Sequence, residues 1–503
     1  MTQLQDKQVL ILGLGESGLA MARWCAREGA HVNVADTRTE PPQLAVLREE
    51  LPHANFVAGE FNADLLRDVQ AVFRSPGLTP AQVAPVVDAA RESGIEVGGE
   101  LSLFADALAQ LKETQAYSPA VLAITGTNGK TTVTSLTGQL VDRSGHTVAV
   151  AGNIGPTLLD TLASKIDGGA LPQVWVIELS SFQLETPGAF EPTAAAVLNV
   201  TQDHLDWHGT MDAYAQAKSR VFGKAGAMVL NREDAIVMRM LPAPVRVKGG
   251  KFEQRDHVTF GSDMPQHHGD FGIEVVNGMA WLVRALEADE TRRSRKDEEE
   301  ELHFQRLMPA DALRIRGRHN AVNALAALAL ATRAGCQLGP MLFGLREYRG
   351  EPHRVAPIGC VNGVEYFDDS KGTNVGATVA ALQGLGAERK VVVILGGDGK
   401  GQDFSPLADP VSRYARGAVL IGRDGPQIRA VLEATGVTLI DAATMHDAVR
   451  HAAERAHSGD AVLMSPACAS FDMFRNYEHR AEAFHDAVRA IAIEAGVDLE
   501  VQI

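Results

Sequence analysis

The residues with the clearest chemical potential form a glycine turn, Gly126-Thr-Asn-Gly-Lys-Thr131, between an apolar stretch and a helix-forming one. Glycine at positions 126 and 129 lets the backbone turn tightly, so that successive N–H groups face one concave spot that suits an anion. Lys130 is placed to reach the β- and γ-phosphates of a nucleotide, and the Thr131 hydroxyl to bind Mg²⁺. The turn therefore predicts a site for ATP or GTP.

The match to the phosphate-binding pattern is incomplete, because the strict form has a glycine six residues before the lysine, where this chain has Ile124. The alternative is a glycine-rich strand-to-helix turn with an exposed lysine. The predicted strand Val121 to Ile124 and the helix that opens at Thr131 favour the phosphate loop, since the positive end of that helix points at the phosphates.

A second glycine pattern, Gly13-Leu-Gly-Glu-Ser-Gly18, follows the predicted strand Gln8 to Leu12. A helical stretch and the strand His31 to Asp36 complete a βαβ unit, and Asp36 lies where such units place an acid for a ribose hydroxyl. Taken alone, this unit predicts NAD. The same glycines also serve turn geometry and helix packing, so any dinucleotide, mononucleotide or nucleotide sugar fits. Ser75-Pro-Gly77 ends another predicted strand and either faces the same crevice or is a purely structural turn.

Polar residues end each of the three strands predicted after the phosphate loop: Thr147 to Asn153, Val174 to Ser180 and Ala194 to Thr201. Ligands gather at the carboxyl ends of parallel strands. Glu178 closes an apolar run and must be paired or bound to a metal, because burying a lone carboxylate is costly. With Asp203 and His204 after the next strand, it indicates a hard cation beside the phosphates. The alternative is that His204 only caps the following helix.

Helical spacing places Lys218 on the inward stripe of the predicted helix Met211 to Phe222, together with Tyr214 and Val221. Two interpretations stay open. The side chain extends along its stem to solvent, or it is desolvated, loses its proton readily and becomes chemically modifiable.

Beyond Leu230 the pattern changes to short strands, including a hairpin over Glu274 to Arg284 that turns at Asn277-Gly278. The mixed charge run Glu287 to Glu301 predicts a solvated loop or a disordered insertion. Asn320 and Asn323 lie one turn apart at the start of an Ala/Leu-rich helix, where they are placed to hydrogen-bond a base.

From Gly363 onward strands and helices alternate again, which predicts a further sheet. Its strand ends carry the polar segments Asp368 to Thr373, Gly396 to Lys400 and Ser465 to Ser470. Lysines and hydroxyls on one rim suit a small, doubly anionic substrate. Arg354 lies in the predicted hinge before this sheet, where it is placed to hold an ATP phosphate when the domains close.

Length and composition limit the classes of protein that are possible. A chain of 503 residues is about three domains long. The hydrophobic share of 45% and charged share of 22% are ordinary for a globular protein, and the net charge of −16 argues against nucleic-acid binding. Four scattered cysteines without ligand spacing predict reduced thiols, hence the cytoplasm. No apolar run approaches membrane length, so we expect no membrane insertion, and we expect a monomer.

The order of the motifs resembles the Mur ligases of peptidoglycan synthesis over nearly the whole chain. The segments that carry the resemblance are Gly126 to Thr131, Gly152 to Gly155, Glu178 to Gln183, Asn199 to His204, His353-Arg354, Asp369 to Asn374, Gly396 to Lys400 and Ser465 to Ser470. Sister ligases for L-alanine, diaminopimelate or lysine, and the folylpolyglutamate synthetases, have an Asp-x-Ala-His type motif in place of Asp369-Ser-Lys371. This motif indicates the members that add D-glutamate.

The resemblance implies an α/β fold in three domains. Residues 1–105 form a Rossmann-like domain for a UDP-sugar, which overrules the NAD prediction. Residues 106–350 form a central P-loop-type mononucleotide-binding domain for ATP, and residues 351–503 a Rossmann-like domain that binds the amino acid and completes the ATP site. The implied activity is ATP-dependent addition of D-glutamate to UDP-N-acetylmuramoyl-L-alanine through an acyl phosphate, in the peptidoglycan synthesis that cell shape and cell division require.

The resemblance also assigns residues to the three substrates. For the uridine nucleotide substrate they are Glu16, Ser17, Asp36, Thr37, Arg38, Ser75, Gly77, Asn153 and His204. For ATP they are Gly126, Thr127, Asn128, Gly129, Lys130, Thr131, Thr132, Asn320, Asn323, Arg354, Asp369 and Lys371. For D-glutamate they are Thr373, Lys400, Ser470 and the backbone at Tyr477.

Two Mg²⁺ ions are implied as well, one at Thr131 and the ATP phosphates. The other is implied at Glu178, His204 and a carbamate formed by CO₂ on Lys218. The catalytic residues that the resemblance implies are Lys130, Glu178, His204 and Lys218.

Two other classes of protein fit parts of the chain. A dinucleotide-dependent oxidoreductase is supported by Gly13 to Gly18, and a regulatory or motor ATPase by Gly126 to Thr132. An oxidoreductase has no use for the phosphate loop, and a motor has none for a rim that carries Lys371 and Lys400.

Overall fold

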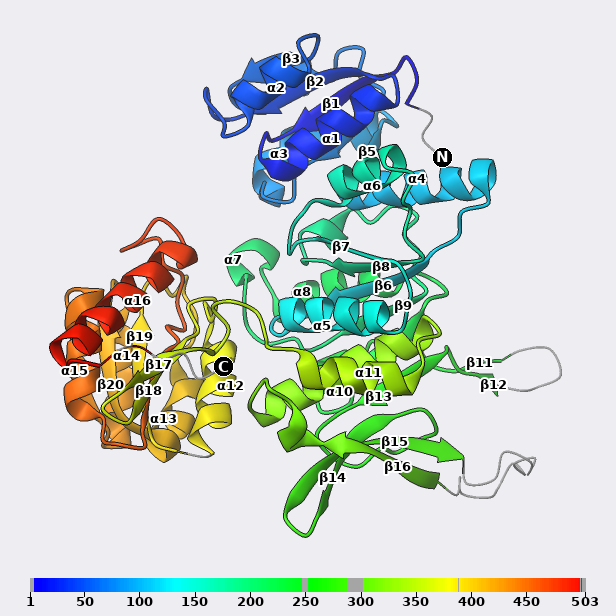
Figure 1. The fold of residues 1–503 in the computed structure, drawn as a ribbon. Helices are drawn as coiled ribbons and strands as arrows, with labels where there is room; N and C mark the ends of the chain where they lie inside the picture. Colours follow the sequence, from blue (N-terminus) through cyan, green and yellow to red (C-terminus); the bar gives the residue numbers. More distant parts are fainter. Residues whose placement is uncertain (1–3, 247–251, 288–301, 388, 498, 500–503) are drawn as a thin grey trace.

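The computed structural model describes residues 4–246, 252–287, 302–387, 389–497 and 499. It forms three bodies, each built on its own main sheet (Figure 1). The blue N-terminal body and the cyan-to-green central body are stacked, and the yellow-to-red C-terminal body lies beside the central one. From residue 288 to 301, the charge run predicted to be a loop lies outside the described residues.

The N-terminal body is a parallel sheet in the order β3-β2-β1-β4-β5 with helices on its faces. Its central strand, β1, is almost wholly buried, which fits the continuous apolar run of a parallel strand covered on both sides. The elements are β1 Gln8–Leu12, α1 Glu16–Arg27, β2 His31–Asp36, α2 Leu44–Glu50, β3 Asn55–Ala58, β4 Ala71–Arg74, α3 Pro80–Glu92 and β5 Glu96–Gly98. The predicted βαβ opening is confirmed.

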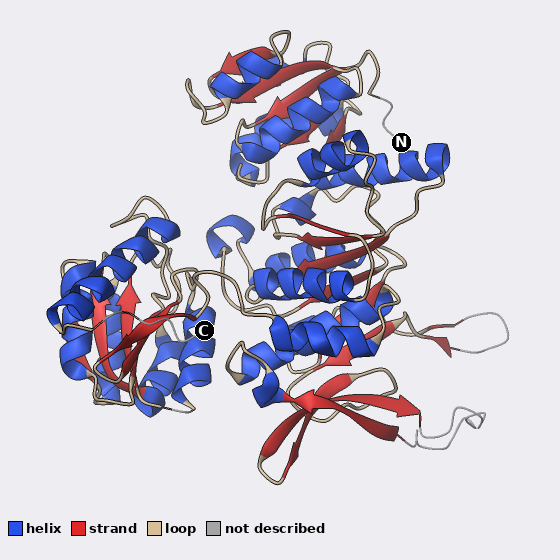
Figure 2. Cartoon of the chain, viewed as in Figure 1, coloured by secondary structure: helices blue, strands red, loops and turns tan. Residues whose placement is uncertain are grey.

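The central body holds a nine-stranded sheet in the order β16-β15-β14-β13-β10-β9-β6-β8-β7. The strands from β14 to β7 in that order are parallel, and β15 and β16 then pair antiparallel at the other end of the sheet, which lies at the bottom of Figure 2. The predicted hairpin is confirmed, because Asn277 and Gly278 both have positive φ, at 51° and 82°.

Helices α5, α10 and α11 cover one face of this sheet. The strands are β6 Ala120–Thr125, β7 Val148–Gly152, β8 Val174–Glu178, β9 Ala194–Val197, β10 Ala227–Asn231, β11 Val245–Arg246, β12 Phe252–Glu253, β13 His257–Phe260, β14 Phe271–Val276, β15 Met279–Glu287 and β16 Leu302–Pro309. The helices are α4 Glu100–Gln115, α5 Lys130–Arg143, α6 Leu158–Asp167, α7 Leu205–His208, α8 Met211–Ser219, α9 Ala235–Met238, α10 Arg318–Arg333 and α11 Leu338–Glu347.

The C-terminal body is a six-stranded sheet in the order β17-β18-β22-β19-β20-β21, with apolar clusters on both faces. The sequence did not predict β17, which pairs antiparallel with β18. The elements are β17 Ala356–Val361, β18 Val364–Asp368, α12 Val375–Gly386, β19 Val391–Gly396, α13 Ala408–Tyr414, β20 Ala415–Ile421, α14 Gly425–Leu432, β21 Thr438–Asp441, α15 Met445–Arg455, β22 Ala461–Met464 and α16 Tyr477–Glu494.

One apolar cluster runs through both the N-terminal and the central body. At their junction the ring of Phe104 on α4 packs edge-on against Trp175 on β8, with 5.1 Å between centroids. The Trp175 indole donates to the Tyr117 hydroxyl at 2.9 Å. Helix α4 therefore joins the two bodies, and the boundary predicted after residue 105 falls inside it. The predicted polar break at 112–119 is wrong as far as residue 115, because α4 continues to Gln115.

No helix among the described residues is both long enough and apolar enough to cross a membrane.

A buried carboxyl group lies at the same junction. Glu100, at the start of α4, is 3% exposed, and its Oε1 accepts a hydrogen bond from the Leu159 N–H at 3.3 Å. Burial raises the pKa of Glu100 to about 7, although hydrogen bonds from Leu159 and Ser17 oppose the rise. The residue thus ties the start of α1 to the start of α6 through a group that titrates near neutrality.

We predict that Glu100 makes stability depend on pH. Since its pKa is about 7 in the folded chain against 4.5 as the ordinary value, the folded state holds this proton more tightly. The contribution of this proton to the free energy of unfolding is complete when the pH is below the ordinary pKa of the carboxyl group. It is lost as the pH rises through 7, and the loss amounts to about 3 kcal/mol in total.

Urea unfolding followed between pH 5 and pH 8 measures this effect. Glu100→Gln should flatten the profile, whereas Glu113→Gln, an exposed carboxyl on the same helix, should leave it unchanged. Parallel profiles for the parent and Glu100→Gln would assign the pH dependence to other groups.

Candidate active site

The phosphate loop connects β6 to α5, and its shape depends on glycine and on an anchor from a neighbouring loop. Gly126 and Gly129 have φ values of 157° and 83°, which residues with a Cβ rarely adopt. A Cβ on Gly129 would lie 2.9 Å from Oδ1 of Asn323. Asn199 anchors the turn from the neighbouring loop, because its Oδ1 accepts from the Asn128 N–H at 2.8 Å and its Nδ2 donates to the Asn128 carbonyl at 3.0 Å. The predicted strand–turn–helix is confirmed.

Two cationic side chains lie on this loop. Lys130 Nζ donates to the carbonyl oxygens of Gly126 and Thr127, both at 2.9 Å, and burial lowers its pKa. From the hinge, Arg354 Nη2 donates to the Thr131 hydroxyl at 2.9 Å. The arginine predicted to reach the nucleotide from the hinge therefore contacts the phosphate loop, and the Thr131 hydroxyl predicted to bind Mg²⁺ is its acceptor in this arrangement.

Lys218 lies beneath the loop and is 1% exposed. Its Nζ donates to the Gly126 carbonyl at 2.9 Å and lies 4.5 Å from the centroid of the Tyr214 ring. The inward orientation predicted from helical spacing is confirmed, and extension to solvent is wrong. Helix α8 itself ends at Ser219, and the last turn of the predicted helix is 3₁₀. Burial, followed by the charge of Lys130, holds the pKa of Lys218 well below its usual range, so the neutral amine is favoured.

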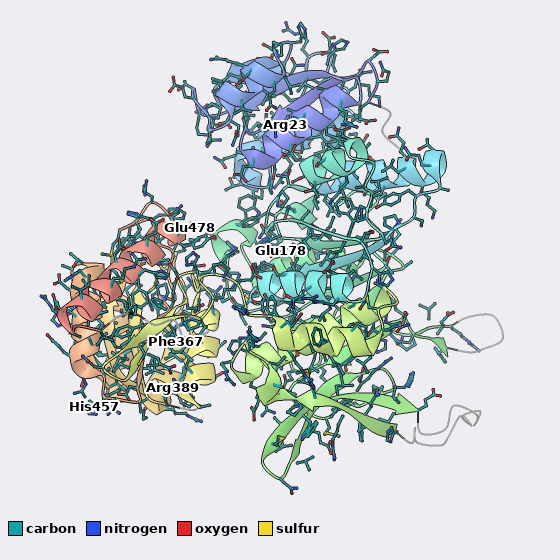
Figure 3. The ribbon with its side chains drawn as sticks, in the orientation of Figure 1. Arg23, Glu178, Phe367, Arg389, His457 and Glu478 are labelled. Atoms are coloured by element: carbon teal, nitrogen blue, oxygen red, sulfur yellow. The ribbon has the colours of Figure 1, made fainter. Side chains whose placement is uncertain are left out.

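Glu178 ends β8 on the side of the central body that faces the C-terminal body (Figure 3). It is 1% exposed, and its Oε1 accepts from Asn153 Nδ2 at 2.7 Å. Its Oε2 is buried and has no hydrogen-bond partner among the described residues. A buried carboxylate oxygen without a partner is costly, so this atom fits a divalent cation bound by oxygen ligands.

His204 lies between the phosphate loop and the C-terminal body. Its backbone is left-handed, with φ at 53°, and its ring packs against Phe182 at 4.8 Å between centroids. Burial lowers the pKa of His204; Asp203 opposes this, and the charge of Lys400 adds to it. His204 is the N-cap residue of α7, as the alternative had it, but its side chain makes no cap hydrogen bond, so the imidazole is left for another role. A neutral imidazole here can serve as a ligand or an acceptor.

The nucleotide turns of the N-terminal body converge as predicted. A Cβ on Gly13 would lie 3.0 Å from Ser75 Cβ, so the two turns lie side by side. Asp36 is buried, and its carboxylate accepts from the Leu14 N–H at 2.7 Å and from two nitrogens of Arg38 at 2.8 Å. These contacts show Asp36 holding the turn and Arg38, so the prediction of NAD from this acid has no support in the structure.

A cavity of about 280 Å³ lies between the central and C-terminal bodies, next to the phosphate loop. Its lining includes Asn320, Asn323, Arg354 and Asp369, all predicted for ATP, and also His319, which the sequence analysis missed. Asn323 Nδ2 donates to Asn320 Oδ1 at 3.2 Å. Asn128, Gly129 and Thr132 of the phosphate loop line it too, so seven of the residues predicted for ATP gather around one cavity, whereas Gly126, Thr127, Lys130, Thr131 and Lys371 are outside its lining.

The C-terminal rim carries the remaining predicted residues. Asp369 accepts from the Ser465 hydroxyl at 2.6 Å, and burial raises its pKa to about 7. Lys371 Nζ lies 5.5 Å from the centroid of the Tyr477 ring. Ser470 is buried after β22, Thr373 follows Lys371, and Lys400 has a positive φ of 51°.

Sequence analysis missed several residues that organise the site. Asn374 Nδ2 bridges the bodies, donating to Asn128 Oδ1 at 2.9 Å and to Asp203 Oδ2 at 3.3 Å. Arg480 is 1% exposed and donates to the Ser370 and Cys468 carbonyls at 2.7 and 3.0 Å, joining two rim loops. Asn374 entered the prediction only as the last residue of the segment Asp369 to Asn374, and no motif marked Arg480, because the contacts of both depend on loops that meet only in the folded protein.

Models of three protein domains match the chain, one at each body. The Mur ligase MurD-like N-terminal domain matches residues 7–99, the Mur ligase middle domain residues 124–331, and the Mur ligase glutamate ligase domain residues 353–468. With the phosphate loop and the interdomain cavity, these matches show that the chain belongs to the Mur ligase family.

Curated relatives show to which members of the Mur ligase family the chain is similar in sequence. Proteins named UDP-N-acetylmuramoylalanine--D-glutamate ligase from Albidiferax ferrireducens, Polaromonas sp. and Ralstonia nicotianae are 69%, 59% and 58% identical to the chain. The matches cover 99%, 99% and 98% of this chain and 99%, 100% and 98% of those proteins. Within its family the chain therefore groups with the ligases of this name.

Solved structures share the fold. MurF ligase from Thermotoga maritima in complex with ADP superposes with a TM-score of 0.56 at 15% identity, covering 97% of this chain and 96% of that one. UDP-N-acetylmuramate-alanine ligase MurC from the same organism gives 0.54 at 20% identity, covering 96% and 99%. At such identities the likeness concerns the fold alone, and the predicted three-domain α/β architecture is confirmed.

We predict that Lys130→Ala lowers the rate of ligation at least about a hundredfold, because a preorganised cation at the transferring phosphoryl group is lost. Binding of the uridine nucleotide should stay nearly intact, since its turns belong to another body. Steady-state rates and calorimetric titration measure the two effects. Lys112→Ala, an exposed lysine on α4, is the control, and equal loss of both functions in folded Lys130→Ala would contradict this partition.

Proposed function

We propose that the chain joins the amine of D-glutamate to the alanyl carboxylate of UDP-N-acetylmuramoyl-L-alanine and converts ATP to ADP and phosphate. One observation supports this proposal most strongly. The phosphate loop and the rim that carries Lys371 and Lys400 are joined by a hydrogen bond of 2.9 Å from Asn374 Nδ2 to Asn128 Oδ1. An ATP-dependent ligase needs such an arrangement, because the activated carboxylate and the incoming amine must meet at one place.

The reaction follows from the low reactivity of a carboxylate. The alanyl carboxylate attacks the γ-phosphorus, ADP leaves, and an acyl phosphate forms. The amine of D-glutamate then adds to the acyl carbon, loses its proton and expels phosphate. Lys130 and Arg354, both at the phosphate loop, stabilise the negative charge on the transferred phosphoryl group.

The residues around Glu178 fit two Mg²⁺ ions. We assign one to Thr131 and the ATP phosphates, and the other to Glu178, His204 and a carbamate on Lys218. The orphaned Oε2 of Glu178 and the depressed pKa of Lys218 support this assignment, since a neutral amine is the form that reacts with CO₂ and a carbamate offers anionic oxygens. When bound, the ions neutralise phosphate charge and polarise the reacting oxygens.

The substrate assignments of individual residues are part of this proposal. Glu16, Ser17, Asp36 to Arg38, Ser75 and Gly77 surround the crevice for the uridine nucleotide, with Asn153 and His204 toward the muramoyl end. Thr373, Lys400, Ser470 and the Tyr477 backbone hold D-glutamate. Residues 1–105, 106–350 and 351–503 are the corresponding functional units.

We place this reaction in the cytoplasm, as a step of cell wall synthesis on which cell shape and division depend. The four cysteines are free thiols, as a reducing compartment requires. We propose a monomer, because each substrate is reached by residues of one chain.

Phosphate release from ATP tests the function. With UDP-N-acetylmuramoyl-L-alanine present, D-glutamate should give rapid release, while L-alanine, diaminopimelate, lysine and L-glutamate should give background release. ATP turnover that needs no amino acid would point to a motor or regulatory ATPase, and NAD(H) binding without a response to UDP-sugars would point to an oxidoreductase.

The carbamate gives a separate prediction. Lys218→Ala should be nearly inactive, and acetate or propionate should restore part of the activity, because a carboxylate in the vacated space supplies the missing anionic oxygens. Lys218→Arg should fail despite its charge, and Lys224→Ala, an exposed lysine nearby in sequence, should behave like the parent. Full activity of Lys218→Arg would remove the carbamate from the proposal.

A further inference from the structure

Three metal-ligating side chains from separate elements meet in the C-terminal body, away from the residues assigned to Mg²⁺. Asp368 ends β18, His353 lies in the loop before β17, and His485 is on α16. Asp368 Oδ2 lies 2.6 Å from His353 Nδ1 and 3.0 Å from His485 Nε2. One ligand atom from each of the three residues lies within 4.8 Å of the other two.

The carboxylate at the centre of this cluster is fixed in place. Asp368 is 0% exposed, and its Oδ1 accepts from the Ser370 N–H at 2.9 Å, so Oδ2 is aimed at the two rings. Burial alone would raise the pKa of Asp368, but hydrogen bonds from His485, His353 and Ser370 hold it below its usual value. The group is therefore an anion at neutral pH.

The two imidazoles complete a site that an ion can enter. Their side chains are 25% and 33% exposed, for His353 and His485 respectively. His353 has a positive φ of 61°, a conformation uncommon for a residue with a side chain, which holds its ring over Asp368. With neutral imidazoles the cluster carries one negative charge, so a divalent cation leaves a single positive charge.

We propose that His353, Asp368 and His485 bind a divalent transition metal of the Zn²⁺ or Co²⁺ type. Two imidazole nitrogens and one carboxylate oxygen suit such ions, whereas Mg²⁺ prefers oxygen ligands alone. Three protein ligands leave a fourth position for water. The bound ion ties the C-terminal helix α16 to β18 and to the loop that carries Arg354, so we expect it to stabilise the C-terminal body.

Metal binding needs only small changes in the cluster. Each ring moves its proton from the nitrogen that faces Asp368 to its other nitrogen, so neutral imidazoles bind the ion without net proton release. Because Zn–N bonds are about 2.1 Å long, the two ring nitrogens must lie no more than about 4.2 Å apart. The partly exposed rings can rotate to that separation. Acid should weaken binding, since the ligands must be deprotonated.

Titration of the chelator-treated full chain with Co²⁺, in excess Mg²⁺, tests the proposal. The visible d–d absorption of Co²⁺ should report one ion per chain in a low-coordinate site, displaced by Zn²⁺, and Zn²⁺ should raise the melting temperature. His485→Gln should lower the affinity at least tenfold and abolish that rise. Glutamine keeps an N–H for Asp368, and His353→Gln provides a second variant that removes the other ring.

Two control variants separate this site from others. His451→Gln removes an exposed histidine of α15 and should bind Co²⁺ like the parent. His204→Gln should also keep the signal, which distinguishes this cluster from the catalytic one. Equal Co²⁺ binding by the parent and His485→Gln, or no spectral change in the parent with a tenfold excess of Co²⁺, would show a hydrogen-bonded cluster only and overturn the proposal.

Discussion

The carbonyl oxygen of Gly126 accepts hydrogen bonds from two lysines, Lys130 and Lys218, each at 2.9 Å. Two ammonium groups that share one buried acceptor repel each other, and desolvation adds to the cost of charging both. The two sites are unequal, since Lys218 is the more enclosed and its pKa is the more strongly depressed. Charging both amines at this single carbonyl is therefore costly, and the carbamate proposed on Lys218 depends on the downward shift of its pKa.

The polar contacts between bodies are of two kinds. Between the N-terminal and central bodies, Arg74 pairs with Glu185 at 2.9 Å, and both side chains are largely buried. Burial lowers the pKa of Arg74, so breaking this pair would leave an uncompensated charge. The C-terminal body contacts the central one through Arg354 and Asn374, which touch the phosphate loop itself. The C-terminal body is therefore held against the central one at the phosphate loop itself.

Much of this site could be predicted because it follows local rules. Helical periodicity placed Lys218 inside, and the rule that ligands gather at strand ends marked Glu178 and His204. The roles of Asn374 and Arg480 could not be predicted, since each depends on partners more than a hundred residues away or on loops that meet only in the folded domain. Strand β17 was missed because proline and glycine interrupt its apolar pattern. The acid at Asp36 misled, since periodicity cannot show that an arginine two residues later already occupies it.

The segment that joins the central and C-terminal bodies stores conformational strain. Gly350, His353 and Val355 all have positive φ, at 91°, 61° and 49°. For a β-branched residue such as Val355 this is a rare conformation, and it costs about 1–3 kcal/mol. The strained residues His353 and Val355 flank Arg354, so the costly dihedrals belong to the same segment that places Arg354 on the phosphate loop. The C-terminal body is thus attached through a segment held in costly dihedrals and through polar contacts at the phosphate loop, whereas the other two bodies share one apolar core.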